Sequence, residues 1–251
     1  MGELDKRVAL VTGAGVGIGK AIALRLAEAG AFVGVHFNSS EKEAESTLEE
    51  VRNGGGEGML LRADLANAGA AAGIVDKLVA KTRQLDILVN NAGDPLERVK
   101  LEECSLETWE KSLAVNLTGS FAVTQRAIPH LRASGNGAII NNLSLSVQTG
   151  GGGGAGPYAI AKGGLQVMTR TLARELAPEV RTNAIMPGVI ETRHHERFTA
   201  PERMEQYKKE TPMNRNGQAE EVAGAVLFLA SDAARFINGA LLDINGGRFL
   251  R

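Results

Sequence analysis

The feature that most constrains the fold is a regular alternation between short apolar runs and longer stretches of helical periodicity. Strand-like runs lie at 7–12, 32–37, 58–61, 87–89, 138–142, 181–186 and 241–244. Helix-like stretches lie between them at 17–29, 41–52, 68–82, 106–131, 158–177 and 219–230. This alternation is typical of βαβ units. We therefore predict the α/β class, with a doubly wound, parallel, seven-stranded sheet and helices on both faces.

The chain offers no point at which to divide it into two domains. Its one low-complexity stretch is the glycine run 150–154, which is too short for an interdomain tether and is expected to form a loop. We therefore predict a single domain over 1–251. Right-handed crossovers would bring the loops after the strands to one edge of the sheet, where ligands of such sheets bind.

Composition excludes several classes of function. The formal net charge is −1 and charges of both signs are interspersed, which argues against a nucleic-acid or anionic-membrane surface. No apolar run approaches the ~20 residues that span a bilayer, and the N-terminal residues lack a signal-peptide core. The single cysteine, Cys104, cannot form an intrachain disulfide. We expect a cytoplasmic protein with no membrane or nucleic-acid partner.

A glycine-rich turn follows the first predicted strand. Gly13, Gly17 and Gly19 form a G-x-x-x-G-x-G pattern, whereas G-x-G-x-x-G fits in no register. Glycines let the backbone approach a ligand closely, and the following helix N-terminus offers N–H groups to a diphosphate. Tight strand–helix turns also use glycine for packing alone, so the pattern indicates a nucleotide site without proving it.

Tyr158 and Lys162 stand one helical turn apart, on the same face of a predicted helix. A phenol with a pKa near ~10 is a poor acid or base at neutral pH. A neighbouring ammonium favours the phenolate and lowers that pKa. The pair therefore suggests general acid–base chemistry, although an amphipathic helix with a solvated lysine would show the same spacing.

These segments together resemble the short-chain dehydrogenase/reductase family, and the resemblance runs nearly from end to end. The glycine loop matches the cofactor loop of the family, and the segments 90–93 and 187–192 match its N-N-A-G and P-G-x-I-x-T elements. Asn116, with Tyr158 and Lys162, matches three members of its catalytic tetrad. The chain looks closest to the 3-oxoacyl-[acyl-carrier-protein] reductase-like branch. The resemblance implies a Rossmann-like fold and NAD(P)(H)-dependent interconversion of a ketone and a secondary alcohol.

The resemblance also implies a role for each member of the tetrad. Tyr158 would act as general acid or base, and Lys162 would lower its pKa and bond the nicotinamide ribose. Asn116 would anchor a water in a proton relay, or bond a helix kink, and the two roles can coexist. The fourth member is a serine that holds the substrate oxygen. Counting from the preceding strand favours Ser144, whereas counting back from the tyrosine leaves Ser146 as an alternative.

Cofactor choice depends on the end of the second predicted strand. No acidic residue occurs in 31–40, so nothing there repels the 2′-phosphate of NADP. Val16 stands where many NADP-preferring relatives carry arginine, and Asn38 and Ser39 supply hydrogen bonds without charge. We predict NADP(H), with NAD(H) as the alternative. Asp64 matches the acid that contacts adenine in the family; an ordinary helix N-cap is the other interpretation of this residue. The expected cofactor contacts are Gly13, Gly15, Val16, Gly17, Ile18, Gly19, Asn38, Ser39, Asp64, Leu65, Asn91, Ala92, Gly93, Tyr158, Lys162, Pro187, Gly188, Val189, Ile190 and Thr192.

The segment at about 189–212 would form a lid over a small carbonyl or alcohol substrate, as in the family. It carries His194 and His195, but no ligand spacing links them to other histidines, so we expect no metal. A carrier-protein substrate is an alternative that the neutral or acidic stretches 133–136 and 178–179 disfavour. A non-catalytic dinucleotide-binding protein is a second alternative, disfavoured by the intact tetrad. The resemblance implies a homotetramer built on helices 106–131 and 158–177.

Overall fold

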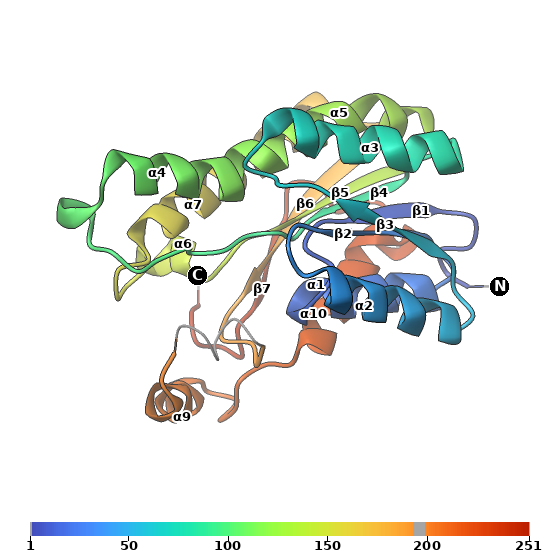
Figure 1. The fold of residues 1–251 in the computed structure, drawn as a ribbon. Helices are drawn as coiled ribbons and strands as arrows, with labels where there is room; N and C mark the ends of the chain where they lie inside the picture. The colour runs from blue at the N-terminus through green and yellow to red at the C-terminus, as the bar shows by residue number, and fades with distance from the viewer. Residues whose placement is uncertain (1, 193–198, 251) are drawn as a thin grey trace.

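Seven parallel strands form one sheet in a computed structural model that describes residues 2–192 and 199–250 (Figure 1). Their order across the sheet is β3-β2-β1-β4-β5-β6-β7. This order confirms the predicted doubly wound α/β fold. The strands are β1 (Val8–Val11), β2 (Phe32–Phe37), β3 (Gly58–Arg62), β4 (Ile87–Asn90), β5 (Gly137–Asn142), β6 (Val180–Pro187) and β7 (Leu241–Ile244).

Strand β1, near the middle of the sheet, is apolar throughout because both faces of the sheet are covered. Side chains of successive strand residues point to opposite faces. Ala9 and Val11 of β1 therefore pack into one core, whereas Val8 and Leu10 pack into the other. A strand that is buried on both sides needs this kind of continuous apolar run.

Helices form a layer on each face (Figure 1). One layer consists of α1 (Gly17–Glu28), α2 (Glu41–Asn53) and α10 (Ala219–Ala230). The other contains α3 (Ala68–Thr82), α5 (Gly119–Ala133) and α7 (Gly156–Glu175), with α4 (Leu106–Leu113) against α7. The short α6 (Ser146–Thr149) follows β5, and α9 (Pro201–Glu210) stands outside both layers, near the C-terminus.

The predicted helix 106–131 is in fact three pieces. Between α4 and α5 lies a π-helical turn, Ala114–Thr118, that contains the fully buried Asn116. Apolar periodicity runs through this turn, so the sequence pattern did not reveal it. Helix α9 was also missed, because its exposed, charged surface lacks an apolar stripe.

The order of the strands creates a crevice at the carboxyl edge of the sheet. The chain leaves β1 toward β2 on one side, whereas β4 lies on the other side of β1, so the loops after β1 and β4 diverge. Such a switch point is where doubly wound sheets bind ligands. Within 2–192 and 199–250, no helix combines the length and the hydropathy of a membrane span.

Candidate active site

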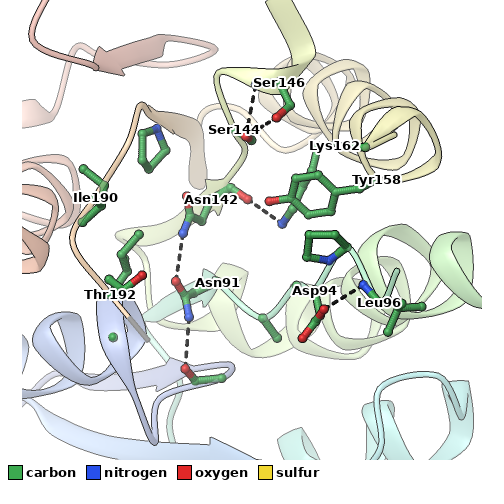
Figure 2. A pocket seen from close by; sticks show the side chains of 18 of the residues that line it. Asn91, Asp94, Leu96, Asn142, Ser144, Ser146, Tyr158, Lys162, Ile190 and Thr192 are labelled. Carbon is green, nitrogen blue, oxygen red and sulfur yellow. Dashed lines mark hydrogen bonds between the residues drawn. The ribbon is translucent and has the colours of Figure 1, made fainter. Parts of the chain in front are cut away.

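A cavity of about 1180 Å³ opens at this switch point. Its walls come from the loops after β1, β2, β3, β4, β5 and β6, together with the start of α7, α9 and the C-terminal segment (Figure 2). Pockets for drug-sized ligands hold roughly 300–1,000 Å³. The cavity is therefore large enough for a dinucleotide together with a small second molecule.

At one wall of the cavity, the backbone of the glycine loop packs closely against other backbone atoms. Gly13 has a φ of +63°, in the left-handed region, and a Cβ there would lie 3.0 Å from Ala92 Cα. A Cβ on Gly19 would lie only 2.0 Å from the carbonyl oxygen of Gly13. Helix α1 begins at Gly17, and its N-cap residue, Val16, makes no side-chain hydrogen bond to the first turn. The turn therefore leaves its amide groups available to an anion.

Asn91 ties three loops of the site together. Its Nδ2 donates to the carbonyl oxygens of Thr12 at 2.9 Å and Gly13 at 3.1 Å, and its Oδ1 accepts from Asn142 Nδ2 at 2.9 Å (Figure 2). Thr12 Oγ1 in turn accepts from the backbone N–H groups of Asn91 and Ala92. These bonds hold the glycine loop, the end of β4 and the end of β5 in one fixed arrangement.

His36 supports the glycine loop, a role that the sequence reasoning missed. Its Nδ1 accepts from the backbone N–H of Gly13 at 3.0 Å, so Nε2 carries the ring proton and faces Ala63 O at 3.2 Å. Burial lowers the pKa of His36 to about 4, which keeps the ring neutral. The available signal was one polar residue near the end of an otherwise apolar strand.

The tyrosine and both candidate serines lie beside one another (Figure 2). The hydroxyl of Ser144 is near enough to the phenol of Tyr158 to lower its pKa. Ser144 Oγ also donates to Ser146 Oγ at 3.1 Å and accepts from the Ser146 backbone N–H at 3.1 Å. Ser144 is therefore the serine that acts on the phenol, while Ser146 holds Ser144 in place.

Lys162 is buried beneath the phenol, with 1% of its surface exposed. Its Nζ donates to Asn142 O at 2.8 Å and lies 5.8 Å from the centre of the Tyr158 ring. A Cβ on Gly93 would lie 2.9 Å from Lys162 Nζ and 2.8 Å from Asn116 Oδ1. Gly93 thus leaves the space in which the lysine and the asparagine come together.

The pKa of Tyr158 moves in the direction opposite to the one predicted. Tyr158 retains part of its surface toward the cavity, yet burial raises its pKa to about 12. The neighbouring hydroxyl of Ser144 lowers that pKa, and the negative charge of Asp94 raises it. Burial also lowers the pKa of Lys162 to about 8, because desolvation disfavours the ammonium. The predicted lowering of the tyrosine pKa was wrong, because desolvation of the phenol is the largest cause of its shift and raises the pKa.

Asn116 forms hydrogen bonds at the π-helical turn between α4 and α5, which is the structural role that the sequence analysis left open. Its Nδ2 donates to Asp94 O at 2.9 Å and Ser112 O at 3.0 Å, and its Oδ1 accepts from Asp94 N at 3.0 Å. Asn116 is fully buried behind the cavity wall, so it does not line the cavity itself. Its part in a proton relay stays a prediction.

Most of the expected cofactor contacts line the cavity. Gly15 is the exception, because a Cβ there would meet Ser40 Oγ at 3.1 Å, and its carbonyl accepts from Thr47 Oγ1 at 3.2 Å. Gly15 instead lines a smaller cavity of about 420 Å³ beside α2. The residues that do line the main cavity are Gly13, Val16, Gly17, Ile18, Gly19, Asn38, Ser39, Asp64, Leu65, Asn91, Ala92, Gly93, Tyr158, Lys162, Pro187, Gly188, Val189, Ile190 and Thr192.

Two further sequence expectations concern the role of Asp64 and the absence of a metal site at His194 and His195. Asp64 is not the N-cap of α3, because Asn67 caps that helix by accepting from Ala70 N. His194 and His195 lie outside the described residues. In the part of the chain that the structure describes, no cluster of three or more histidine, cysteine or acidic side chains is suited to a metal.

Comparison with known proteins identifies relatives over almost the whole chain. Residues 13–248 match a family model described as enoyl-(acyl carrier protein) reductase. A 3-oxoacyl-[acyl-carrier-protein] reductase from Synechocystis is 39% identical over 98% of both chains. A solved short-chain dehydrogenase/reductase from Serratia marcescens is 37% identical, with a TM-score of 0.92 over 98% of this chain and 99% of that one. A short-chain dehydrogenase from Burkholderia cenocepacia, solved with NADP, is 31% identical, with a TM-score of 0.90 over 98% and 99%.

Proposed function

The chain belongs to the short-chain dehydrogenase/reductase family, in its 3-oxoacyl-[acyl-carrier-protein] reductase-like branch, and from that membership we propose how its residues carry out the reaction. The family makes it an NAD(P)-dependent oxidoreductase that interconverts a ketone and a secondary alcohol, not a non-catalytic binding protein. The assignment of residues depends above all on one observation: the hydroxyl of Ser144 is near enough to the phenol of Tyr158 to lower its pKa, and the buried Lys162 Nζ lies 5.8 Å from the centre of the same ring.

The glycine loop fits the diphosphate of a nicotinamide dinucleotide. Gly19 leaves no room for a Cβ, and Gly13 has a positive φ that other residues rarely adopt, so a side chain at either position would displace the loop. The amide groups at the start of α1 would bond the phosphates, and the segment 187–192 would lie along the nicotinamide half. Asn38, Ser39, Asp64 and Leu65 would hold the adenosine half. When bound, the nicotinamide supplies or accepts the hydride at its C4.

Tyr158 is the proposed proton donor during reduction. With a pKa near 12 it is protonated at neutral pH, ready to donate to the carbonyl oxygen. Ser144 would hold that oxygen beside the phenol, so that two hydroxyl donors stabilise the developing alkoxide. Lys162 would stabilise the phenolate that forms and bond the nicotinamide ribose, since a pKa near 8 leaves it mostly charged at pH 7. Asn116 would anchor the water that returns the proton.

We propose NADP(H) as the preferred cofactor, with NAD(H) as the alternative. Asn38 and Ser39 are exposed at the mouth of the cavity after β2, where they would donate hydrogen bonds to a 2′-phosphate. No carboxylate in 31–40 would repel that group. Val16 supplies no charge, so we expect a modest preference.

A homotetramer is the proposed assembly, because large apolar side chains are exposed on two separate parts of the surface. One group, on α4, α5 and α7, comprises Leu106, Phe121, Ile160 and Val167; the other, on α10, β7 and the segment between them, comprises Phe228, Phe236 and Leu242. Two self-complementary patches generate a tetramer with two kinds of two-fold interface. The cytoplasm stays the predicted location, on the single cysteine alone.

The assignment is tested by replacing each of the two serines with alanine in turn. Consumption of NADPH is followed spectrophotometrically with a panel of small ketones, for the wild-type enzyme, Ser144→Ala and Ser146→Ala. We expect Ser144→Ala to lose at least 100-fold in kcat, as the removal of one oxyanion donor does. Ser146→Ala should lose less than 10-fold, because it only positions Ser144. An equal loss in the two variants, or a larger loss in Ser146→Ala, would contradict the assignment.

A further inference from the structure

The cavity carries basic side chains outside the two segments, the glycine loop and the loop after β2, that are proposed to bind the phosphates of the cofactor. Besides Lys162, the basic residues that line it are Arg98, Lys111, Arg203 and Arg248. The acidic residues that line it are Asp64 and Asp94, and each already accepts a backbone N–H. In the described ranges, therefore, five basic side chains face the cavity against two acidic ones.

Two of these arginines form a built cluster at the lid. Arg203 and Arg248 stack on Tyr207, each with its guanidinium carbon 4.3 Å from the ring centre. Glu210 accepts from both: from Arg203 Nη1 at 2.9 Å and from Arg248 Nη2. The C-terminal segment thus meets α9 at two guanidinium groups that share Tyr207 and Glu210, and we call them the arginine pair.

The arginine pair retains unused bonding capacity and unused charge. The Nη1 atom of Arg248 is buried and has no hydrogen-bond partner among the described residues. Leaving such a donor unsatisfied is costly, more so for a charged group. Among the described residues, two guanidinium charges against one carboxylate, Glu210, leave a net charge of +1 on the cluster. Guanidinium groups bind carboxylates and phosphates through short, directional hydrogen bonds.

We propose that the arginine pair, Arg203 and Arg248, binds a carboxylate of the substrate, so that the ketone this enzyme reduces is a keto acid. The proposal rests on the proposed function, because it names the substrate class of the same site. A carboxylate carries one negative charge, which matches the net charge of the cluster. A phosphate monoester carries about −1.5 to −2 and would be left partly unpaired.

The charge distribution also orients the keto acid. At the reacting end, Lys162 and Asp94 both line the cavity beside Tyr158 and their charges offset each other, so this end has no net charge to attract an anion. The lid end favours one. A keto acid would therefore present its carbonyl to Ser144 and Tyr158 and its carboxylate to the lid, separated from the carbonyl by part of the carbon chain. Fixing both ends positions the carbonyl carbon for hydride transfer.

The test compares matched charged and neutral ketones. The probes are acetoacetate, 4-oxopentanoate and 5-oxohexanoate, the primary amide of each acid, and the pair dihydroxyacetone phosphate and dihydroxyacetone. The enzymes are the wild type, Arg203→Gln, Arg248→Gln and Arg248→Lys, with Arg25→Gln as control, because Arg25 forms an exposed ion pair on α1 away from the cavity. The readouts are kcat/KM for each ketone and the Kd of NADPH from its fluorescence.

We expect the wild type to prefer at least one keto acid over its amide by about 10-fold or more, as one charge-assisted hydrogen bond implies. Arg203→Gln and Arg248→Gln should lower kcat/KM for that acid about 10- to 100-fold, and change its amide and the Kd of NADPH less than threefold. Arg248→Lys should retain part of the preference. Arg203 is exposed, so its variant should fold even if the Arg248 variants do not.

Three results would overturn the proposal while leaving the proposed function in place. They are equal activity on acids and amides, a preference for the phosphate ester over every keto acid, and a loss of NADPH binding in the arginine variants equal to the loss of activity. The last result would assign the arginine pair to the cofactor. Failure of the wild type to reduce any ketone, charged or neutral, with either NADPH or NADH would instead contradict the proposed function.

Discussion

Gly19→Ala tests whether the glycine loop is the cofactor cradle. The added Cβ would lie 2.0 Å from Gly13 O and 2.4 Å from Asn91 Nδ2, whereas carbon contacts are optimal near ~3.5 Å, so the loop or α1 must move by about 1 Å or more. Overpacking of this kind costs roughly 1–3 kcal/mol. For a domain of this size, that cost corresponds to a fall of about 2–12 °C in Tm.

The effect on cofactor binding should exceed the effect on stability. Because the shift moves the first-turn amides away from the diphosphate, we expect the Kd of NADPH to rise at least tenfold, a loss of about 1.4 kcal/mol. The matched control is Gly73→Ala in α3, where a Cβ meets nothing within 4 Å. This variant should gain roughly 0.5–1 kcal/mol in stability from helix propensity and leave the Kd unchanged.

Fluorescence titration with NADPH and differential scanning calorimetry measure the two quantities. A Gly19→Ala variant that binds NADPH within twofold of the wild type would refute the assignment of the loop. A loss of affinity in Gly73→Ala as large as that in Gly19→Ala would show that the assay reports general destabilisation rather than the cradle.

Three further predictions concern the surroundings of the site. His36 is held neutral with a pKa near 4, against 6.5 when unfolded, so the unfolded chain binds the proton first as pH falls. The free energy of unfolding should therefore drop by about 2–3 kcal/mol between pH 7.5 and 4.5 through this group, and urea unfolding of His36→Gln should show a drop smaller by that amount. Val16→Arg should lower the Kd of NADPH about 5- to 10-fold and leave that of NADH within twofold, because a guanidinium at the loop would bond the 2′-phosphate. Fluorescence titration measures both Kd values, and equal changes for the two cofactors would contradict that placement. Gly93→Ala would put a Cβ 2.9 Å from Lys162 Nζ, and we expect kcat in steady-state assays to fall at least tenfold with the fold intact by circular dichroism; undiminished turnover would show that the close packing is not needed.

Much of the fold could be predicted because burial on both sides of a parallel sheet leaves a strong pattern. The apolar runs gave β2 and β7 with their observed bounds, and helical periodicity gave α3 and α10 likewise. The π-helical turn at Asn116 was not predicted, since one extra residue in a turn changes the hydrogen bonding of the helix and leaves its apolar spacing nearly intact.

Short motifs predicted which residues lie in the site, but not their pKa values or the path of the loops that carry them. Motif spacing brought Ser144, Tyr158 and Lys162 to one place, but the direction of the tyrosine pKa depends on three-dimensional burial, which no motif records. Gly15 belongs to the glycine loop in sequence, yet the path of that loop turns it toward α2. The arginine pair joins residues 45 positions apart, 203 and 248, and only the folded chain brings them together.

The turnover of Tyr158→Phe tests the central claim most directly, because the substitution removes one hydroxyl and little else. Single-turnover oxidation of NADPH by a ketone that the wild type reduces would be followed by stopped-flow absorbance, alongside a fluorescence titration of NADPH binding. We predict a Kd for NADPH within threefold of the wild-type value and a rate of hydride transfer lower by at least 10³-fold, toward the upper end of what general acid catalysis contributes. Hydride transfer at the wild-type rate in Tyr158→Phe would contradict the assignment of Tyr158 as the proton donor.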